Sequence, residues 1–106
     1  MSKDYEEYIE KNISLLNNKT TKGMQVSIDI SMYPNKEDFI PPIKGFIKEI
    51  NNYNDLIIKT FPTSTVVQGE YNHAMNSIQK TIEACHKKFK NAVYVIKVIP
   101  DYRALD

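Results

Sequence analysis

The chain has few of the residues on which several common kinds of site depend. Among its 106 residues are one cysteine, Cys85, and three glycines, Gly23, Gly45 and Gly69. A single cysteine excludes an internal disulfide and a cysteine-based zinc cluster. Three scattered glycines exclude a phosphate-binding glycine loop at the usual spacings. A small acylphosphatase-like hydrolase is a further alternative with little support, because its anion cradle needs a nearby arginine and the only arginine is Arg103, near the C-terminus.

An excess of charge and long apolar runs are absent as well. The 14 basic and 13 acidic residues give a formal net charge of +1, which argues against a nucleic-acid binder that depends on neutralising phosphates. No apolar run approaches the length of a membrane span. The acidic N-terminus, with Asp4, Glu6, Glu7 and Glu10, has no apolar signal-peptide core. We therefore expect a cytoplasmic protein without nucleic-acid or membrane partners.

The first 23 residues differ in character from the rest of the chain. Tyr5, Tyr8, Ile9 and Leu16 form a partial helical stripe, and residues 17–23 form a polar linker. We interpret residues 1–23 as a helical extension that precedes a single domain at residues 24–106. Two alternatives stay open for the extension: a frayed terminal helix, or a helix that docks on a neighbour.

Hydrophobic periodicity predicts six elements in the domain. Residues 24–33 alternate strictly, with Val26, Ile28, Ile30 and Met32 on one side, as expected for a half-buried strand. The complete prediction is strand 24–33, helix 40–50, strands 56–61 and 65–68, helix 72–89 and strand 92–99. This order predicts an α+β ferredoxin-like βαββαβ sandwich, in which two helices cover one face of a four-stranded antiparallel sheet. The opposite face stays open unless another subunit covers it.

The other side of the first strand is polar. Serine and aspartate are poor strand formers, so their repetition there suggests a purpose beyond exposure to water. The turn between the middle strands adds more hydroxyl groups, and a second carboxylate follows the third strand. The predicted ligand-binding residues are Ser27, Asp29, Ser31, Tyr33, Thr63, Ser64, Thr65 and Glu70. Such a set suits a ligand with amine donors and ring-nitrogen acceptors.

Two points of this prediction stay open. Strand pleating prevents Ser64 and Thr65 from pointing the same way unless the turn twists the chain. Glu70 could instead be a first-turn carboxylate of the second helix.

Other reactive groups have simpler interpretations. Cys85 lies on the apolar stripe of the second helix, so we expect a small buried side chain rather than a nucleophile. His73 and His86 fit a solvated helix surface, and we expect no metal site.

Four segments together resemble the small thiamine-binding proteins of the YkoF-like superfamily: MQVSIDISMYP, FIPPIKGFI, LIIKTFPTSTVVQGEYNHAM and AVYVIKV. The resemblance covers about residues 24–106. It implies a ferredoxin-like domain that assembles through its sheets into homodimers or homotetramers. It also implies non-catalytic binding of thiamine (vitamin B1) or its hydroxymethylpyrimidine moiety, without a further cofactor, in a pocket on the sheet face at a subunit interface.

In that interpretation Asp29 and Glu70 are carboxylate partners of the ligand, and Tyr33 is a stacking surface. The hydroxyl partners are Ser27, Ser31, Ser64 and Thr65. Two features depart from the family pattern: Thr63 stands where a methionine is expected, and residues 1–23 lie outside the usual domain. The alternative function is an oligomeric interaction module without a small-molecule ligand.

Overall fold

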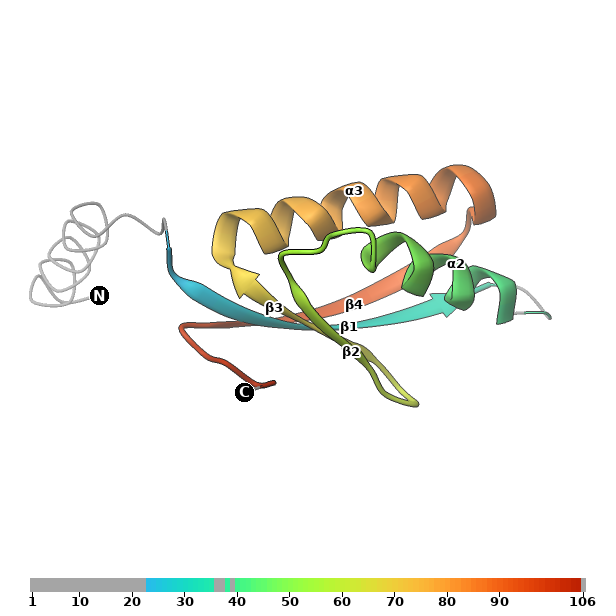
Figure 1. The fold of residues 1–106 in the computed structure, drawn as a ribbon. Helices are drawn as coiled ribbons and strands as arrows, with labels where there is room; N and C mark the ends of the chain where they lie inside the picture. The colour runs from blue at the N-terminus through green and yellow to red at the C-terminus, as the bar shows by residue number, and fades with distance from the viewer. Residues whose placement is uncertain (1–22, 36–37, 39, 106) are drawn as a thin grey trace, which may run out of the picture.

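The computed structural model describes residues 23–35, 38 and 40–105, and within them two helices cover one face of an antiparallel sheet (Figure 1). The elements are β1 (Gln25–Pro34), α2 (Ile40–Ile50), β2 (Ile57–Thr60), β3 (Thr65–Glu70), α3 (Tyr71–Phe89) and β4 (Ala92–Pro100). The strands lie in the order β2-β3-β1-β4. This is the predicted α+β ferredoxin-like arrangement. The predicted N-terminal helix falls outside the described residues.

The alternation in β1 determines which side chains form the core. Val26, Ile28 and Ile30 are at most 2% exposed and face the helices, as predicted. Ile28 lies opposite Val67 of β3 and Val98 of β4. Because β1 has a partner strand on each side, its apolar face is the centre of the sheet's contact with the helices.

The two helices bury complementary stripes. In α2 the buried side chains are Pro42, Phe46 and Ile50, spaced four residues apart. Along α3 they are Ala74, Ser77, Ile78, Thr81 and Cys85. A Cβ atom at Gly45 would overlap the ring of Phe89, so glycine allows α2 and α3 to approach closely there.

The junction of β3 and α3 differs from the prediction. Strand β3 does not end at Gln68, because Gly69 pairs with Val26 and Glu70 with Gln25. Helix α3 starts at Tyr71, directly after the strand. The Glu70 carboxylate accepts hydrogen bonds from the backbone N–H groups of Asn72 (2.8 Å) and His73 (3.1 Å). It therefore satisfies two of the free donors at the start of the helix.

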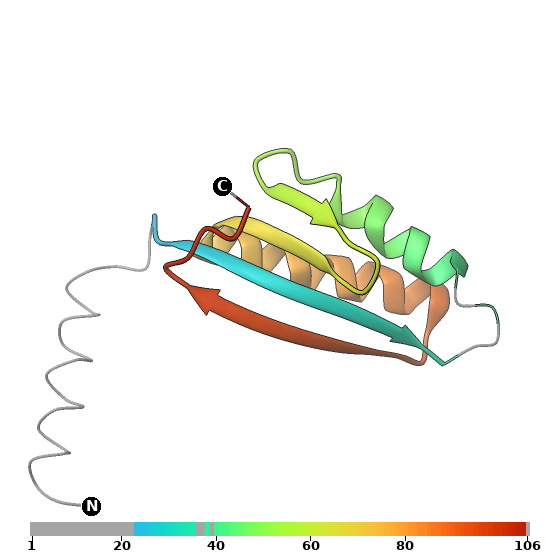
Figure 2. The same cartoon turned by 90° about the horizontal axis from the view of Figure 1, so that it is seen from below.

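The end of the chain folds back across the open face of the sheet (Figure 2). The backbone N–H of Asp101 donates to the carbonyl of Gln25 (2.8 Å). The Ser27 hydroxyl donates to the carbonyl of Tyr102 (2.7 Å) and accepts from the N–H of Ala104 (2.8 Å). These bonds fix a C-terminal tail, residues 101–105, over the first residues of β1.

Replacing Glu70 with alanine should lower the free energy of unfolding by about 1 kcal/mol, because two N–H groups of α3 lose their acceptor. Urea denaturation measures the change. The control is Asn72→Ala, which removes an exposed side chain of the same helical turn and should change stability by less than half as much. Equal losses for the two variants would contradict the capping role.

Candidate functional site

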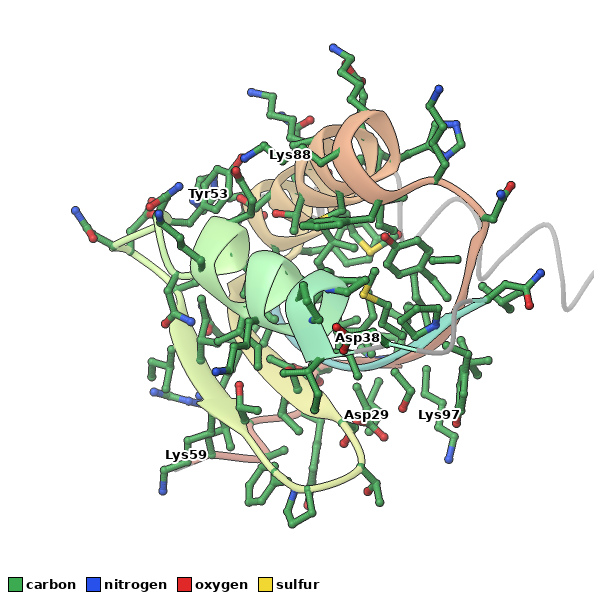
Figure 3. All side chains as sticks on the ribbon, turned by 90° about the vertical axis from the view of Figure 1, so that its right-hand side faces the viewer. Asp29, Asp38, Tyr53, Lys59, Lys88 and Lys97 are labelled. Carbon is green, nitrogen blue, oxygen red and sulfur yellow. The ribbon has the colours of Figure 1, made fainter. Side chains whose placement is uncertain are left out.

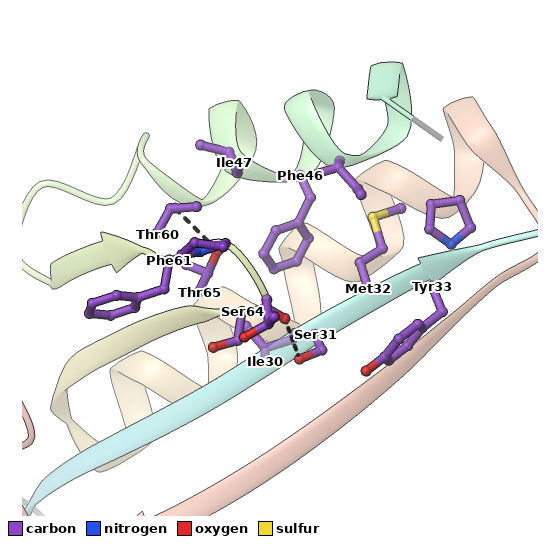
Figure 4. Close-up of a pocket in the computed structure, with 14 residues that line it drawn as sticks. Ile30, Ser31, Met32, Tyr33, Phe46, Ile47, Thr60, Phe61, Ser64 and Thr65 are labelled. Carbon is purple, nitrogen blue, oxygen red and sulfur yellow. Dashed lines mark hydrogen bonds between the residues drawn. The ribbon is translucent and has the colours of Figure 1, made fainter. Parts of the chain in front are cut away.

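A cavity of about 420 Å³ opens at the C-terminal end of β1, between α2 and the turn that joins β2 to β3 (Figure 4). Three segments line it: residues 30–34 of β1, residues 60–65 around the turn, and three apolar side chains of α2. The α2 side chains are Ile43, Phe46 and Ile47. Because the strand, the helix and the turn meet here, residues far apart in the sequence share one recess.

Hydroxyl groups supply the polar side chains of this cavity. The hydroxyls of Thr60 and Thr65 lie 3.2 Å apart and hydrogen-bond to each other. The Ser31 hydroxyl donates to the backbone carbonyl of Thr63 (3.0 Å), which ties β1 to the turn. A hydroxyl can donate once and accept twice, so each keeps capacity for a ligand. Among the described lining residues none carries a formal charge at neutral pH.

Aromatic side chains provide the apolar part of the lining. Phe46 is almost fully buried and stands over the sheet from α2. Phe61 and Tyr33 are 46% and 58% exposed, at the turn and at the end of β1. A flat ring could therefore pack against a fixed inner aromatic side chain and two outer ones.

The structure brings five of the eight predicted site residues to this cavity: Ser31, Tyr33, Thr63, Ser64 and Thr65. Thr65 lies opposite Ile30, which faces the helices. It is 4% exposed, so its side chain belongs to the helix-covered side of the sheet. The cavity thus joins the helix-covered side to the edge of the open face, and does not lie on the open face itself.

The other three predicted residues lie elsewhere. Ser27 is buried beneath the C-terminal tail and bonded to it. Glu70 caps α3 at the far end of β3, as the alternative interpretation expected. Asp29 lies on the open sheet face, outside the cavity lining.

Several lining residues were not predicted from the sequence. Thr60 and Phe61 flank the turn whose hydroxyls were singled out, so their position beside it was an available signal. Phe46 and Ile47 belong to the apolar stripe of α2. Periodicity alone cannot distinguish a core position from a cavity wall at the end of such a stripe.

Asp29 occupies the centre of the open face. In the sheet register it lies opposite Lys97 of β4 on one side and Val66 of β3 on the other, and Val66 lies opposite Lys59 of β2. Figure 3 shows Asp29, Lys59 and Lys97 on the side of the sheet away from the helices. One carboxylate oxygen of Asp29 is buried without a hydrogen-bond partner in the described chain. A buried unpaired carboxylate oxygen is costly.

Apolar side chains surround this group of charges. Those of the open face that are at least 42% exposed are Val93, Val95 and Ile99 of β4, Ile57 and Phe61 near β2, and Tyr33 of β1. Exposed apolar groups that gather on one face mark an interaction surface more often than scattered ones do. We call these residues, with Asp29, Lys59 and Lys97, the open-face patch.

Other kinds of site find little support in the described residues. No group of three or more histidine, cysteine, aspartate or glutamate side chains is placed to hold a metal ion within 23–35, 38 and 40–105. Neither α2 nor α3 has the length and apolar character needed to cross a membrane. His73 hydrogen-bonds to Asp55 (2.7 Å), an exposed carboxylate in the loop before β2.

Cys85 is a buried residue of α3, as predicted. Burial raises the pKa of its thiol, the negative charge of Glu49 raises it further, and Lys88 opposes this effect. Burial also raises the pKa of the neighbouring Tyr94 to about 12, and Cys85 adds to that increase. A nucleophilic cysteine needs the opposite shift and an accessible sulfur.

Comparison with known proteins gives matches among solved structures only. No family model and no curated protein matches the chain. A Streptococcus pneumoniae protein has a TM-score of 0.67 at 20% identity, covering 72% of this chain and 86% of its own. A Thermotoga maritima protein, provisionally described as a thiamine biosynthesis or salvage protein, has a TM-score of 0.66 at 23% identity, covering 76% and 85%. A domain of unknown function from Bacillus cereus has a TM-score of 0.61 at 16% identity, covering 78% and 80%. At these identities the similarity establishes a shared fold.

The Cys85 thiol should react with iodoacetamide much more slowly in the folded protein than in guanidinium, because it is buried and its raised pKa reduces the thiolate fraction. Mass spectrometry of samples quenched over time at pH 8 measures both rates. The variant Gln79→Cys adds an exposed thiol on the same helix and should gain one label rapidly. Comparable rates for Cys85 in the two states would contradict the buried, inert assignment.

Proposed function

We propose that the protein binds thiamine or its hydroxymethylpyrimidine moiety in the cavity beside α2, without catalysing a reaction. The uncharged lining of hydroxyl and aromatic groups is the observation that carries this proposal. The volume of about 420 Å³ falls within the usual range for small-molecule pockets. The fold shared with the Thermotoga maritima protein supports the same ligand class.

The chemistry of an aminopyrimidine matches the lining. Its exocyclic amine donates hydrogen bonds and its ring nitrogens accept them, and the hydroxyls of Thr60, Thr65 and Ser64 can serve both needs. Its flat ring can lie against Phe46 and Phe61. The thiazolium of thiamine would then extend toward the exposed mouth, where the face of Tyr33 can attract a cation.

The same lining supports a binding role for the cavity. The described residues around the cavity include no carboxylate, histidine, lysine or cysteine. These are the groups that most often transfer protons or act as nucleophiles in active sites. A binding role needs only the hydrogen bonds and apolar contacts that the lining provides.

We further propose that the open-face patch pairs with a second copy of the chain, giving a homodimer or homotetramer. The patch contains both signs of charge among exposed apolar side chains: Asp29, which has a buried oxygen without a partner, and two lysines. In a two-fold interface, a contact between one residue of the first copy and a different residue of the second copy always forms twice, once in each direction. Lys97 of one copy could therefore satisfy Asp29 of the next. Tyr33 belongs to both the patch and the cavity, so this packing would also cover the cavity mouth.

The substitution Thr65→Val should weaken thiamine binding about tenfold, the value for one lost hydrogen bond worth about 1.4 kcal/mol. Isothermal titration calorimetry with thiamine and with hydroxymethylpyrimidine measures the affinities. The matched control is Thr81→Val, which removes a buried hydroxyl bonded within α3 and should leave both affinities unchanged. No heat from the wild type at millimolar ligand, or equal losses in both variants, would overturn the binding proposal.

Introducing a charge into the patch with Val95→Asp should shift the protein to monomer, because the new carboxylate faces its own copy across the interface and cannot be solvated there. Sedimentation velocity at tens of micromolar protein measures the state. Asn76→Asp, which adds the same charge on the exposed side of α3, should leave the oligomer intact. A wild type that is monomeric under these conditions would overturn the interface proposal. Titrating Val95→Asp with thiamine would then show whether the cavity binds on its own.

A further inference from the structure

A second apolar surface lies on the helix-covered side, at the outer edge of the molecule. Ile96 and Val98 of β4 lie opposite Ile30 and Ile28, so they share the face that the helices cover. Both are nevertheless 38% exposed. The helical layer therefore does not reach fully over this edge strand.

The flank of α3 continues this surface. The side of α3 that meets α2 and its following loop is marked by His73 bonded to Asp55 and Lys88 paired with Glu49. Met75 and Ile82 are seven residues apart, and at 100° per residue they fall on the other flank, above β4. Both pack on the core but stay half-buried. We call Met75, Ile82, Ile96 and Val98 the edge strip.

We propose that residues 5–16 of the same chain pack along the edge strip as an amphipathic helix, which adds a third helix to the layer over the sheet. The sequence of this segment supplies an apolar helix face that can cover the strip. Tyr5, Tyr8, Ile9, Ile13 and Leu16 recur at spacings of one to four residues, which places them on one side of a helix.

The position at which the chain enters β1 supports this occupant. The carbonyl of Met24 accepts a hydrogen bond from the N–H of Tyr71 (2.8 Å), and Val26 lies opposite Pro100. The start of β1 therefore lies beside both the first residue of α3 and the last residue of β4, at one end of the edge strip. Residues 17–22 span up to about 20 Å when extended, which is enough to turn the chain back.

Length and direction also agree. A helix of twelve residues is about 18 Å long, and the stretch of α3 from Met75 to His86 is also twelve residues. A segment that returns from the start of β1 runs antiparallel to α3. Its first residues then lie beside the end of α3, and its last residues beside Met75.

Charge favours this direction. Residues 4–10 contain four acidic residues and no basic ones. The end of α3 carries His86, Lys87 and Lys88, followed by Lys90. Opposite charges thus lie at the same end in the antiparallel arrangement. The reverse arrangement would remove the acidic residues from these cations.

The open-face patch is a less suitable site for this segment. On that side the C-terminal tail already lies against Gln25, Ser27 and Gln68. A segment that returns from the start of β1 would have to cross this tail. Docking on the edge strip instead leaves the patch free for a second copy.

Cross-linking in the full-length chain tests the proposal. Asn12 falls within the apolar stripe of the segment, and Gln79 is exposed between Met75 and Ile82 on the flank of α3. A short bismaleimide should join the pair in Asn12→Cys/Gln79→Cys within one chain, at least tenfold faster than in Ser14→Cys/Gln79→Cys. Ser14 has nearly the same height on the helix but faces away from the strip. Non-reducing gels and mass spectrometry distinguish intrachain from interchain products.

A stability measurement provides an independent readout. Ile9→Asp should lower the melting temperature of the full chain by about 5 °C, whereas Ser14→Asp should change it by less than about 1 °C. Equal cross-linking rates together with equal melting temperatures would overturn the proposal. Cross-links formed only between chains would overturn it too, because a second copy's segment would then occupy the strip.

Discussion

β1 is hydrogen-bonded to β3 on one side and to β4 on the other over most of its length. A strand held on both sides cannot shift by one residue without moving its apolar set to the wrong face. The alternation of Val26, Ile28 and Ile30 with Ser27 and Asp29 therefore fixes two surfaces at once. One is the core under the helices. The other is the polar face, whose use depends on what covers it.

Two segments of the chain bind side chains of the polar face, the C-terminal tail and the β2–β3 turn. The C-terminal tail uses Ser27 and Gln68 as hydrogen-bond partners, so these two buried polar side chains are satisfied within the chain. Ser31 bonds to the β2–β3 turn and helps to form the cavity. Asp29, between them, keeps a buried oxygen without a partner. In the proposed assembly, the second chain would pack over this middle part of the strand.

The fold and most of the elements could be predicted because they follow from local periodicity. The strict alternation in β1 predicted a strand and the helical spacing in α3 predicted a helix, and both elements were confirmed. The end of β3 could not be predicted, because Gly69 is a usual strand breaker and its pairing with Val26 depends on a distant residue. Only part of the cavity lining could be predicted, for a similar reason. Its hydroxyls cluster at the turn in the sequence, but its walls come from α2, which only the tertiary fold brings to that turn.

The predicted polar face and the observed cavity share Ser31 and Tyr33, and this overlap has a physical origin. The side chains at the end of β1 stand where the neighbouring β2–β3 hairpin turns away from the sheet, so they reach the gap beneath α2 as well as the open face. A ligand in the cavity and a second copy on the patch would then both contact Tyr33. Packing at the interface would reduce the exposure of Tyr33 and hold it against the ligand. For that reason we expect ligand affinity and oligomer formation to be coupled. The coupling free energy equals the difference between the binding free energies of the ligand for the monomer and for the oligomer.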